Sequence, residues 1–306
     1  MTSLAVRVGS LELKNPVLTA SGCFGYGVEV EDLCRAADLG GICTKGLSLS
    51  PRPGNPPARI CETPAGMLNA IGLANIGVDA FCHDRLPLLR ERGVTVIANI
   101  FGTSVGDFKQ IAQKLADHEG IAAIELNVSC PNVSKGGIEF GRDPRLAAEV
   151  TKAVRSIWQG PLWVKMSPEA GDIVGVARAS EAEGADAITA INTVRGMSID
   201  TSKAAQRIAN GTGGLSGPAL RPIALRIVWE LVGALRIPVI GIGGIGTADD
   251  ALQFLMAGAR AVQIGTACFM DPTAPKRVVD GIREFCRLNE VSVSSLIGSA
   301  RSSPPC

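Results

Sequence analysis

Eight short apolar runs, rich in valine and isoleucine, recur along the chain and limit the folds open to it more than any other feature. They lie at Val17–Ala20, Gly41–Thr44, Val94–Ile100, Ile121–Leu126, Leu162–Val164, Ala187–Ile191, Val239–Ile242 and Ala261–Ile264. A mostly apolar run such as Ile121–Leu126 suits a strand that is buried on both faces, as strands of parallel sheets are. Eight is also the number of parallel strands that closes a barrel.

Helical patterns separate most of these runs. Residues 104–107 (S-V-G-D) open one helix with a capping signal, residues 143–144 (D-P) open a second that Gly160 closes, and residues 247–250 open a third that ends at Gly258. Strands that alternate with helices predict right-handed parallel crossovers. We therefore expect an α/β chain that forms a single (β/α)₈ TIM barrel.

The barrel is expected to take up residues 1–306 as one domain, since no internal repeat, linker or low-complexity run interrupts the pattern. Two gaps, residues 46–93 and 194–219, are too long for one helix each. They predict insertions in the βα loops at the C-terminal face, where barrels build their active sites. The tail 299–306 is expected to be frayed.

Charge and cysteine content exclude several classes of function. Lysine plus arginine numbers 30 against 29 for aspartate plus glutamate, so the basic excess typical of nucleic-acid binding is absent. The nine cysteines include no C-x-x-C pair, which predicts no metal or iron–sulfur site in this chain and a reduced, cytoplasmic protein. No apolar run reaches the ~20 residues that span a bilayer, so no membrane association is expected.

Residues 241–246 read G-I-G-G-I-G and satisfy the G-x-G-x-x-G dinucleotide fingerprint literally. That fold requires an acidic residue about 20 positions further on, and Gly265-Thr266 stands there instead. Glycines after the seventh and eighth strands suit a barrel phosphate site made of backbone N–H groups. The alternative is that they are turn glycines.

Polar residues stand where the other barrel strands should end, and in a barrel these ends meet at one mouth. They are Ser21, Thr44, Lys45, Asn99, Asn127, Lys165, Asn192 and Thr193. Residues 69–73 (N-A-I-G-L), in the first long insertion, add an amide beside a glycine. Each residue alone could be a cap or a solvated loop residue, and together they predict a site.

Cys130 is the candidate base. The stretch 124–133 (I-E-L-N-V-S-C-P-N-V) delivers its thiol after a buried strand, and Pro131 turns the chain there. The only histidines, His83 and His118, lie away from strand ends, whereas a thiol pKa can be lowered by lysine or a helix N-terminus. The alternative is that Cys130 is a small core residue. Residues 136–137 (G-G) could hinge a lid.

The chain resembles the dihydroorotate dehydrogenases. The motifs that carry the resemblance span nearly the whole chain: N-P-V-L-T-A-S-G at 15–22, F-G-Y-G at 24–27, T-K-G at 44–46, N-A-I-G-L at 69–73, N-V-S-C-P-N-V at 127–133, K-G-G-I-E-F-G at 135–141, I-N-T at 191–193, G-G-L-S-G-P-A at 213–219, G-I-G-G-I at 241–245 and I-G-T at 264–266. They resemble the soluble class 1, and within it the NAD-linked class 1B catalytic subunit. A cysteine at 130, where the membrane-bound quinone-linked type has serine, argues against that type.

The resemblance implies one FMN per chain in the barrel mouth and a substrate stacked on it. The implied FMN-binding residues are Ser21, Lys45, Gly46, Asn99, Asn127, Lys165, Ile191, Gly217, Gly243, Gly244, Gly265 and Thr266. Dihydroorotate or orotate would contact Lys45, Asn69, Ala70, Ile71, Gly72, Leu73, Asn127, Asn132, Asn192 and Thr193. Cys130 would take a proton from substrate C5 while hydride leaves C6 for the flavin, and Lys165 would stabilise the charge of the reduced flavin.

Onward electron transfer requires a partner, because no dinucleotide or iron–sulfur site is visible in this chain. The resemblance implies a second subunit with FAD and a two-iron, two-sulfur cluster, attached to a homodimer core in a heterotetramer that passes electrons to NAD in pyrimidine (UMP) biosynthesis.

Several alternatives remain open. The chain could be a fumarate-linked class 1A enzyme, an FMN-dependent dihydropyrimidine dehydrogenase or a tRNA dihydrouridine synthase. It could also be a flavin-free phosphate-binding barrel with Lys165 or Lys45 as a Schiff-base lysine, or a non-catalytic binding barrel.

Overall fold

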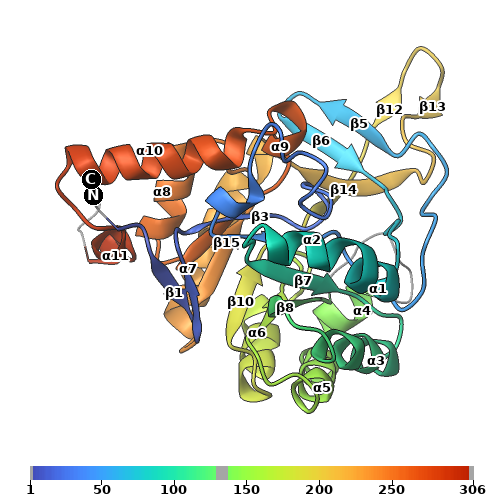
Figure 1. Ribbon diagram of the computed structural model, residues 1–306. Coiled ribbons are helices and arrows are strands. Elements are labelled where there is room, and N and C mark those ends of the chain that lie inside the picture. The colour runs from blue at the N-terminus through green and yellow to red at the C-terminus, as the bar shows by residue number, and fades with distance from the viewer. Residues whose placement is uncertain (1–2, 129–136, 303–306) are drawn as a thin grey trace.

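The protein is a closed eight-stranded parallel barrel with helices packed around it (Figure 1). A computed structural model describes residues 3–128 and 137–302. The barrel strands follow one another around the ring in chain order, and the last pairs with the first. They are β3 (Val17–Thr19), β4 (Gly41–Cys43), β7 (Val96–Ile100), β8 (Ile121–Asn127), β9 (Leu162–Lys165), β10 (Ala187–Ala190), β15 (Val239–Ile242) and β16 (Ala261–Ile264). The predicted TIM barrel and all eight predicted strands are confirmed.

Strand ends differ from the predicted ends by a residue or two, and the differences follow from backbone pairing. The predicted fourth and fifth strands stopped at their last apolar residues, Leu126 and Val164. In the structure β8 continues to Asn127 and β9 to Lys165, because these two residues still pair in register. The parallel ladder depends on backbone groups, so a polar side chain that faces the mouth does not end it.

The helices fill the crossovers, together with short turns of other helical type. The α-helices are α1 (Val78–Ala80), α2 (Leu86–Glu91), α3 (Val105–Ala116), α4 (Gly137–Arg142), α5 (Pro144–Arg155), α6 (Ile173–Ala182), α7 (Arg221–Ala234), α8 (Ala248–Met256), α9 (Ala267–Met270), α10 (Ala274–Leu288) and α11 (Val293–Leu296). The others are the 3₁₀ turns η1 (Ala36–Asp38), η3 (Pro218–Leu220) and η4 (Ser299–Arg301), and the π-helical η2 (Phe81–Arg85).

The three predicted helix starts are confirmed, and one predicted end is wrong. Capping boxes open α3 and α8, and the Asp143 side chain accepts from the N–H of Arg145 at the start of α5. The α5 helix ends at Arg155, before the predicted stop at Gly160. The Arg155 guanidinium donates to the carbonyls of Trp158 and Gly160, which holds that segment as a turn.

The two long insertions lie after β4 and after β10, and they pair with each other. Strands β5 (Ile60–Thr63) and β6 (Gly66–Asn69) come from the first, and β11 (Val194–Met197) and β14 (Thr212–Ser216) from the second. They form one antiparallel sheet in the order β11-β14-β6-β5, seen at the upper right of Figure 1. The second insertion also forms the hairpin of β12 (Ile199–Asp200) and β13 (Ala205–Gln206).

The N-terminal hairpin of β1 (Val6–Val8) and β2 (Leu11–Leu13) lies at the other end of the barrel, where Gly9 approaches Asp186, the residue before β10. Near the C-terminus of the chain, the guanidinium of Arg301 in η4 donates to the carbonyls of Trp229 and Ala257. The prediction that 299–306 is frayed stays a prediction.

Neither a membrane-spanning helix nor a metal site occurs in the described part of the chain. No helix there combines the length and apolarity needed to cross a bilayer. Within residues 3–128 and 137–302, no three histidine, cysteine, aspartate or glutamate side chains are grouped so that they could bind a metal ion.

The α3 cap gives a stability prediction. The Ser104 side chain accepts from the N–H of Asp107, so Ser104→Ala should lower the free energy of unfolding by about 1 kcal/mol. Urea denaturation measures the change. Ser294→Ala, at an exposed helical serine, is the control and should change the stability by less than about 0.5 kcal/mol. Equal effects of the two substitutions would show that the cap contributes nothing.

Candidate active site

Four polar side chains predicted at strand ends are buried: Thr44 after β4 and, on the three strands that follow around one side of the barrel mouth, Asn99, Asn127 and Lys165. Asn99 is in β7, and Asn127 and Lys165 are the last residues of β8 and β9. Their exposed fractions are 0%, 7% and 5%. Barrel geometry makes these ends converge, so two amides and an ammonium group gather where a ligand can reach them.

The loops after β3, β4 and β10 supply the next group of predicted residues, which are partly exposed. These are Ser21, Lys45, Asn192 and Thr193. The Asn192 amide donates to Asn127 Oδ1 at 3.4 Å, which joins the β10 loop to the buried group. Ile191, before Asn192, is buried.

The insertion sheet reaches the mouth through a glycine strand. A Cβ at Gly214 would collide with the Thr193 side chain, and Asn69 Nδ2 donates to the Gly214 carbonyl at 3.2 Å. The absence of a side chain at 214 therefore lets Asn69 and Thr193 approach one another across β14. Residues 70–73 follow β6 directly, and the carbonyls of Ile71 and Leu73 accept hydrogen bonds from Asn55 and Asn75.

The glycines predicted to hold a phosphate lie close to other segments of the chain at two places, one after β15 and one after β16. Gly244 has φ +69°, and a Cβ there would lie 2.9 Å from the Gly217 carbonyl and 2.8 Å from the Arg221 nitrogen. Gly243 has φ +135°. A Cβ at Gly265 would lie 3.3 Å from Ala20, next to the predicted Ser21. Backbone conformation and space thus both require glycine at 244.

An ion pair fixes the loop that carries these glycines. Asp250 accepts from the N–H groups of Gly246 and Thr247 and pairs with the Arg221 guanidinium. The Asp250 side chain is 7% exposed, so it is held at the base of the loop rather than in solvent. The loop after β15 is thereby tied to the first residue of α7.

Lys45 and Lys165 give the mouth a positive charge, and both side chains are partly or wholly removed from solvent. Burial lowers the pKa of Lys45 from its ordinary value. Burial raises the pKa of the Cys23 thiol to about 11, although Lys165 and Lys45 act in the opposite direction. Cys23 is therefore a neutral thiol at neutral pH and a poor candidate for a base.

Below the mouth lies a polar group that the sequence patterns did not predict. Glu125, in β8, is 0% exposed and accepts hydrogen bonds from Asn99, Thr189 and Gln263. The available signal was a glutamate inside a run expected to be buried on both faces, since a buried carboxylate requires partners.

Two predicted residues, Cys130 and Asn132, lie outside the described residues. The predicted hinge at residues 136–137 is described only from Gly137, the first residue of α4. The remaining predicted residues all lie at strand ends or in the insertions.

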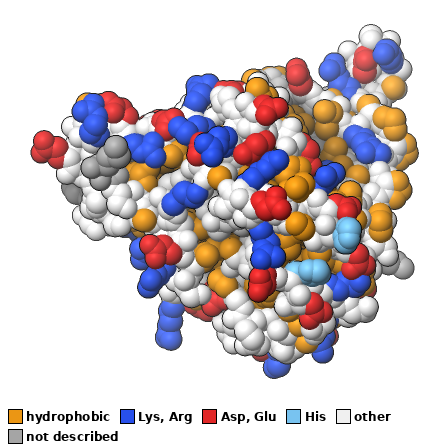
Figure 2. All heavy atoms as spheres, in the orientation of Figure 1, with side chains coloured by type: hydrophobic (Ala, Val, Ile, Leu, Met, Phe, Trp, Pro, Cys, Tyr) orange, Lys and Arg blue, Asp and Glu red, His pale blue; other side chains and the backbone are white. Residues whose placement is uncertain are grey.

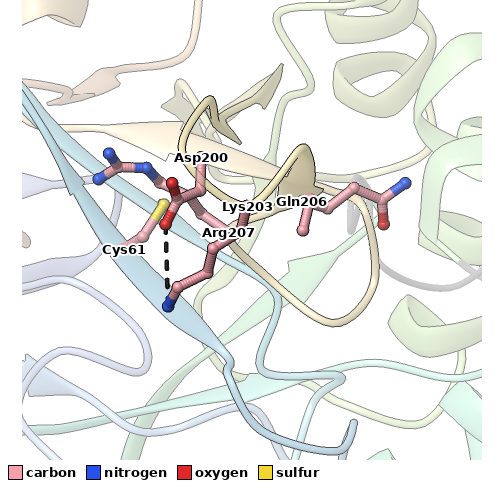
Figure 3. A pocket seen from close by; sticks show the side chains of 6 residues that line it. Cys61, Asp200, Lys203, Gln206 and Arg207 are labelled. Carbon is pink, nitrogen blue, oxygen red and sulfur yellow. Dashed lines mark ion pairs between the residues drawn. The ribbon is translucent and has the colours of Figure 1, made fainter.

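A hollow of about 330 Å³ lies beside the β12–β13 hairpin (Figure 3). It is lined by Cys61, Asp200, Lys203, Ala205, Gln206 and Arg207, none of which is a predicted site residue. The Lys203 ammonium lies 4.0 Å from the Asp200 carboxylate, and the lysine side chain is 77% exposed. This hollow is a solvated surface feature.

Comparison with known proteins places the chain in a family. The family model described as dihydroorotate dehydrogenase matches residues 3–286. A protein of Trichlorobacter lovleyi named dihydroorotate dehydrogenase B (NAD(+)), catalytic subunit, is 50% identical over 298 residues, which cover 97% of this chain and 98% of that protein. A protein of the same name from Thermodesulfovibrio yellowstonii is 49% identical over 300 residues, covering 98% of this chain and 99% of the relative.

A third relative of that name, from Geotalea daltonii, is 50% identical and is covered over 98% of its length. The family model and these relatives extend over both insertions and every barrel strand. The chain therefore belongs to the dihydroorotate dehydrogenase family.

Proposed function

We propose that the chain is the catalytic subunit of an NAD-linked dihydroorotate dehydrogenase, which oxidises dihydroorotate to orotate in pyrimidine synthesis. The observation that carries the proposal is the gathering of Asn99, Asn127 and Lys165 at one barrel mouth, in a chain 50% identical over nearly its whole length to proteins of that name. It is an oxidoreductase, and FMN is the cofactor that suits its site.

The residues at the mouth fit a flavin on two grounds. Asn99 Oδ1 is buried without a hydrogen-bond partner among the described residues, and a Cβ on Gly46 would lie 3.0 Å from it. Such an acceptor calls for a donor, which a flavin ring can provide. The close approach of Gly244 to Gly217 also leaves backbone in place of side chains, as a phosphate cradle requires.

The proposed FMN-binding set is therefore the set implied by the resemblance. Gly217, Gly243, Gly244, Gly265 and Thr266 hold the phosphate, while Ser21, Lys45, Gly46, Asn99, Asn127, Lys165 and Ile191 line the rest of the cofactor. The positive charge of Lys45 and Lys165 balances the phosphate and the charge gained on reduction.

Gly244→Ala should reduce the FMN content of the purified protein severalfold, because the new Cβ would press on the Gly217 carbonyl and the Arg221 nitrogen. Absorbance at the flavin bands relative to protein measures the ratio. Gly93→Ala is the matched control: its φ is +66° against +69° at Gly244, and nothing lies within 4 Å of its Cβ. Equal FMN loss in both variants would assign the effect to backbone strain alone.

The substrate would be held by polar groups of the mouth and the insertions. Lys45, Asn69, Asn127, Asn192 and Thr193 supply an ammonium, amides and a hydroxyl that match the carboxylate and ring amides of dihydroorotate. The segment 70–73 and Asn132 complete the proposed set. FMN, when bound, supplies the two-electron acceptor that these side chains lack. Cys130 is the proposed base that removes the C5 proton.

The proposal also includes a partner subunit, an assembly of several chains and a location in the cell. A partner subunit with FAD and a two-iron, two-sulfur cluster takes electrons to NAD, two copies of this chain form the core of a heterotetramer, and the assembly is cytoplasmic. The words "catalytic subunit" in the relatives' name support such a partner. Co-purification of an untagged flavin and iron–sulfur subunit from the native host tests it. Turnover with fumarate by the isolated chain would favour the fumarate-linked alternative.

Anaerobic reduction tests the activity. The purified protein should be yellow and should be bleached by dihydroorotate but not by dihydrouracil, which lacks the carboxylate. Flavin that stays oxidised with dihydroorotate would overturn the substrate assignment. A tRNA substrate is disfavoured by the even charge balance and by the interspersed acidic and basic side chains on the face in Figure 2.

A further inference from the structure

One layer of side chains inside the barrel is polar, whereas the corresponding layers of such barrels are ordinarily aliphatic. Its members come from the second, fourth, sixth and eighth strands: Cys43 in β4, Glu125 in β8, Thr189 in β10 and Gln263 in β16. Alternate strands contribute the four side chains of a barrel layer, and bulky aliphatic residues dominate such layers. All four are at most 1% exposed. A carboxylate at this depth is costly unless it is fully partnered.

Among the residues that the structure describes, every hydrogen-bond partner of Glu125 acts as a donor. Gln263 Nε2 and Thr189 Oγ1 donate to Oε2 at 2.7 and 2.8 Å. Asn99 Nδ2 and Cys43 Sγ donate to Oε1 at 2.8 and 3.1 Å. Four donors and no acceptor within residues 3–128 and 137–302 is the pattern expected around an ionised carboxylate, which accepts hydrogen bonds but donates none.

Two of the groups around Glu125 belong to the mouth. The Asn99 amide directs its nitrogen to Glu125, which leaves Oδ1 as the atom for a bound molecule. The Lys165 ammonium lies 3.9 Å from Glu125 Oε1, and the two side chains are 6% and 0% exposed. At that separation and burial, the negative charge offsets part of the positive field that Lys165 exerts at the mouth.

We infer that Glu125 is a positioning residue for the cofactor site: it orients the Asn99 amide and moderates the charge of Lys165, and so holds the reduction potential of the bound flavin below the value that Lys165 alone would impose. The inference rests on the proposed function, since it requires flavin at the mouth. No proton or electron passes through Glu125, which acts by its charge and by the orientation that it gives to the Asn99 amide.

Glu125→Gln tests the inference because it removes the charge and keeps the shape. The new amide can be accommodated, since Gln263 Oε1 is buried without a partner among the described residues and an amide flip would present it. At a fixed potential, the ratio of reduced to oxidised flavin should rise at least tenfold, which for a two-electron couple is about 30 mV. Anaerobic titration against reference dyes measures this shift without any turnover.

Thr189→Val is the matched control. It removes one hydrogen bond from Oε2 in the same layer and leaves both the carboxylate and the Lys165 pair at Oε1. A purely structural role predicts that the two variants lower thermal stability and that neither moves the potential. The inference predicts that only Glu125→Gln moves it. An unchanged potential in Glu125→Gln, or equal shifts in both variants, would overturn the inference.

A double variant shows whether the effect comes from the charge of Glu125. The fields of two charges add at the flavin, so Glu125→Gln should also raise the potential in a Lys165→Met background. An unchanged potential in that background would mean that the carboxylate charge does not reach the flavin and would contradict the inference. Should Glu125→Gln alone fail to fold, the double variant removes both charges together, and the comparison with Lys165→Met alone still decides.

The outcomes separate the inference from the proposed function. A chain that binds no FMN, or whose flavin dihydroorotate does not reduce, contradicts the proposed function. A flavoprotein that dihydroorotate reduces, but whose potential is the same in Glu125→Gln, contradicts the inference alone.

Discussion

Cys130→Ala is expected to lower the rate of flavin reduction by dihydroorotate by about 10²–10⁴-fold, the usual contribution of a positioned base. The two histidines cannot replace the thiol, since neither His83 in η2 nor His118 after α3 lies at the mouth. Cys23 is there, but its pKa of about 11 keeps it neutral. Anaerobic stopped-flow absorbance measures the rate, and FMN content should be unchanged.

Cys130→Ser is the companion variant. A hydroxyl is a far weaker acid than a thiol, so the serine variant should regain activity only as pH rises, whereas the parent reaches its plateau at lower pH. Cys268→Ser is the control, since this thiol is buried and its pKa is raised by burial. A flat pH profile in Cys130→Ser, or an unchanged rate in Cys130→Ala, would assign the base elsewhere.

The barrel could be predicted because its signal is local. Each strand is a short apolar run, and each predicted helix start carries its own capping residues, as Ser104 and Asp143 show. The polar residues at strand ends were predictable for the same reason: once the barrel is assumed, polar residues at or near the end of an apolar run are expected at the mouth. Asn99 and Lys165 were found in this way.

What the sequence could not predict depends on contacts between distant segments. Strand β14 (T-G-G-L-S) has little hydrophobic pattern, and its pairing with β6 joins residues far apart in the chain. In the sequence, Glu125 is a single polar residue within an apolar run. Its hydrogen-bond partners Thr189 and Gln263 come from other strands of the barrel. No spacing rule relates three residues that meet only when the barrel closes.

The Asn99–Glu125 pair combines a residue whose position the sequence predicted with a contact that the sequence did not predict. Asn99 was predicted at the mouth from its strand, but the direction of its amide is set by Glu125, which the sequence did not single out. A residue can therefore be placed correctly from sequence while its hydrogen-bonding state remains open. The same holds for Lys165, whose position follows from β9 and whose charge environment follows from β8.

Lys165→Met is expected to lower the rate of flavin reduction by dihydroorotate by about 10²–10³-fold, the size of effect seen when one preorganised group that stabilises developing charge is removed. The Lys165 side chain is 6% exposed and lies at the end of β9, so water cannot replace the ammonium. Methionine keeps most of the side-chain volume. Because Lys165 acts on charge that develops during reduction, the maximal rate should fall more than the apparent dihydroorotate affinity.

Lys152→Met is the matched control for Lys165→Met. Lys152 lies on α5, is 73% exposed and pairs with Glu183 at 3.3 Å, a surface pair whose loss should cost less than about 1 kcal/mol of stability. Its rate of flavin reduction should match the parent's, because the net charge changes equally in both variants and only the location differs. If both variants slowed alike, or if Lys165→Met lost rate only in proportion to lost FMN, the buried ammonium would act in cofactor retention and not on the charge of reduction.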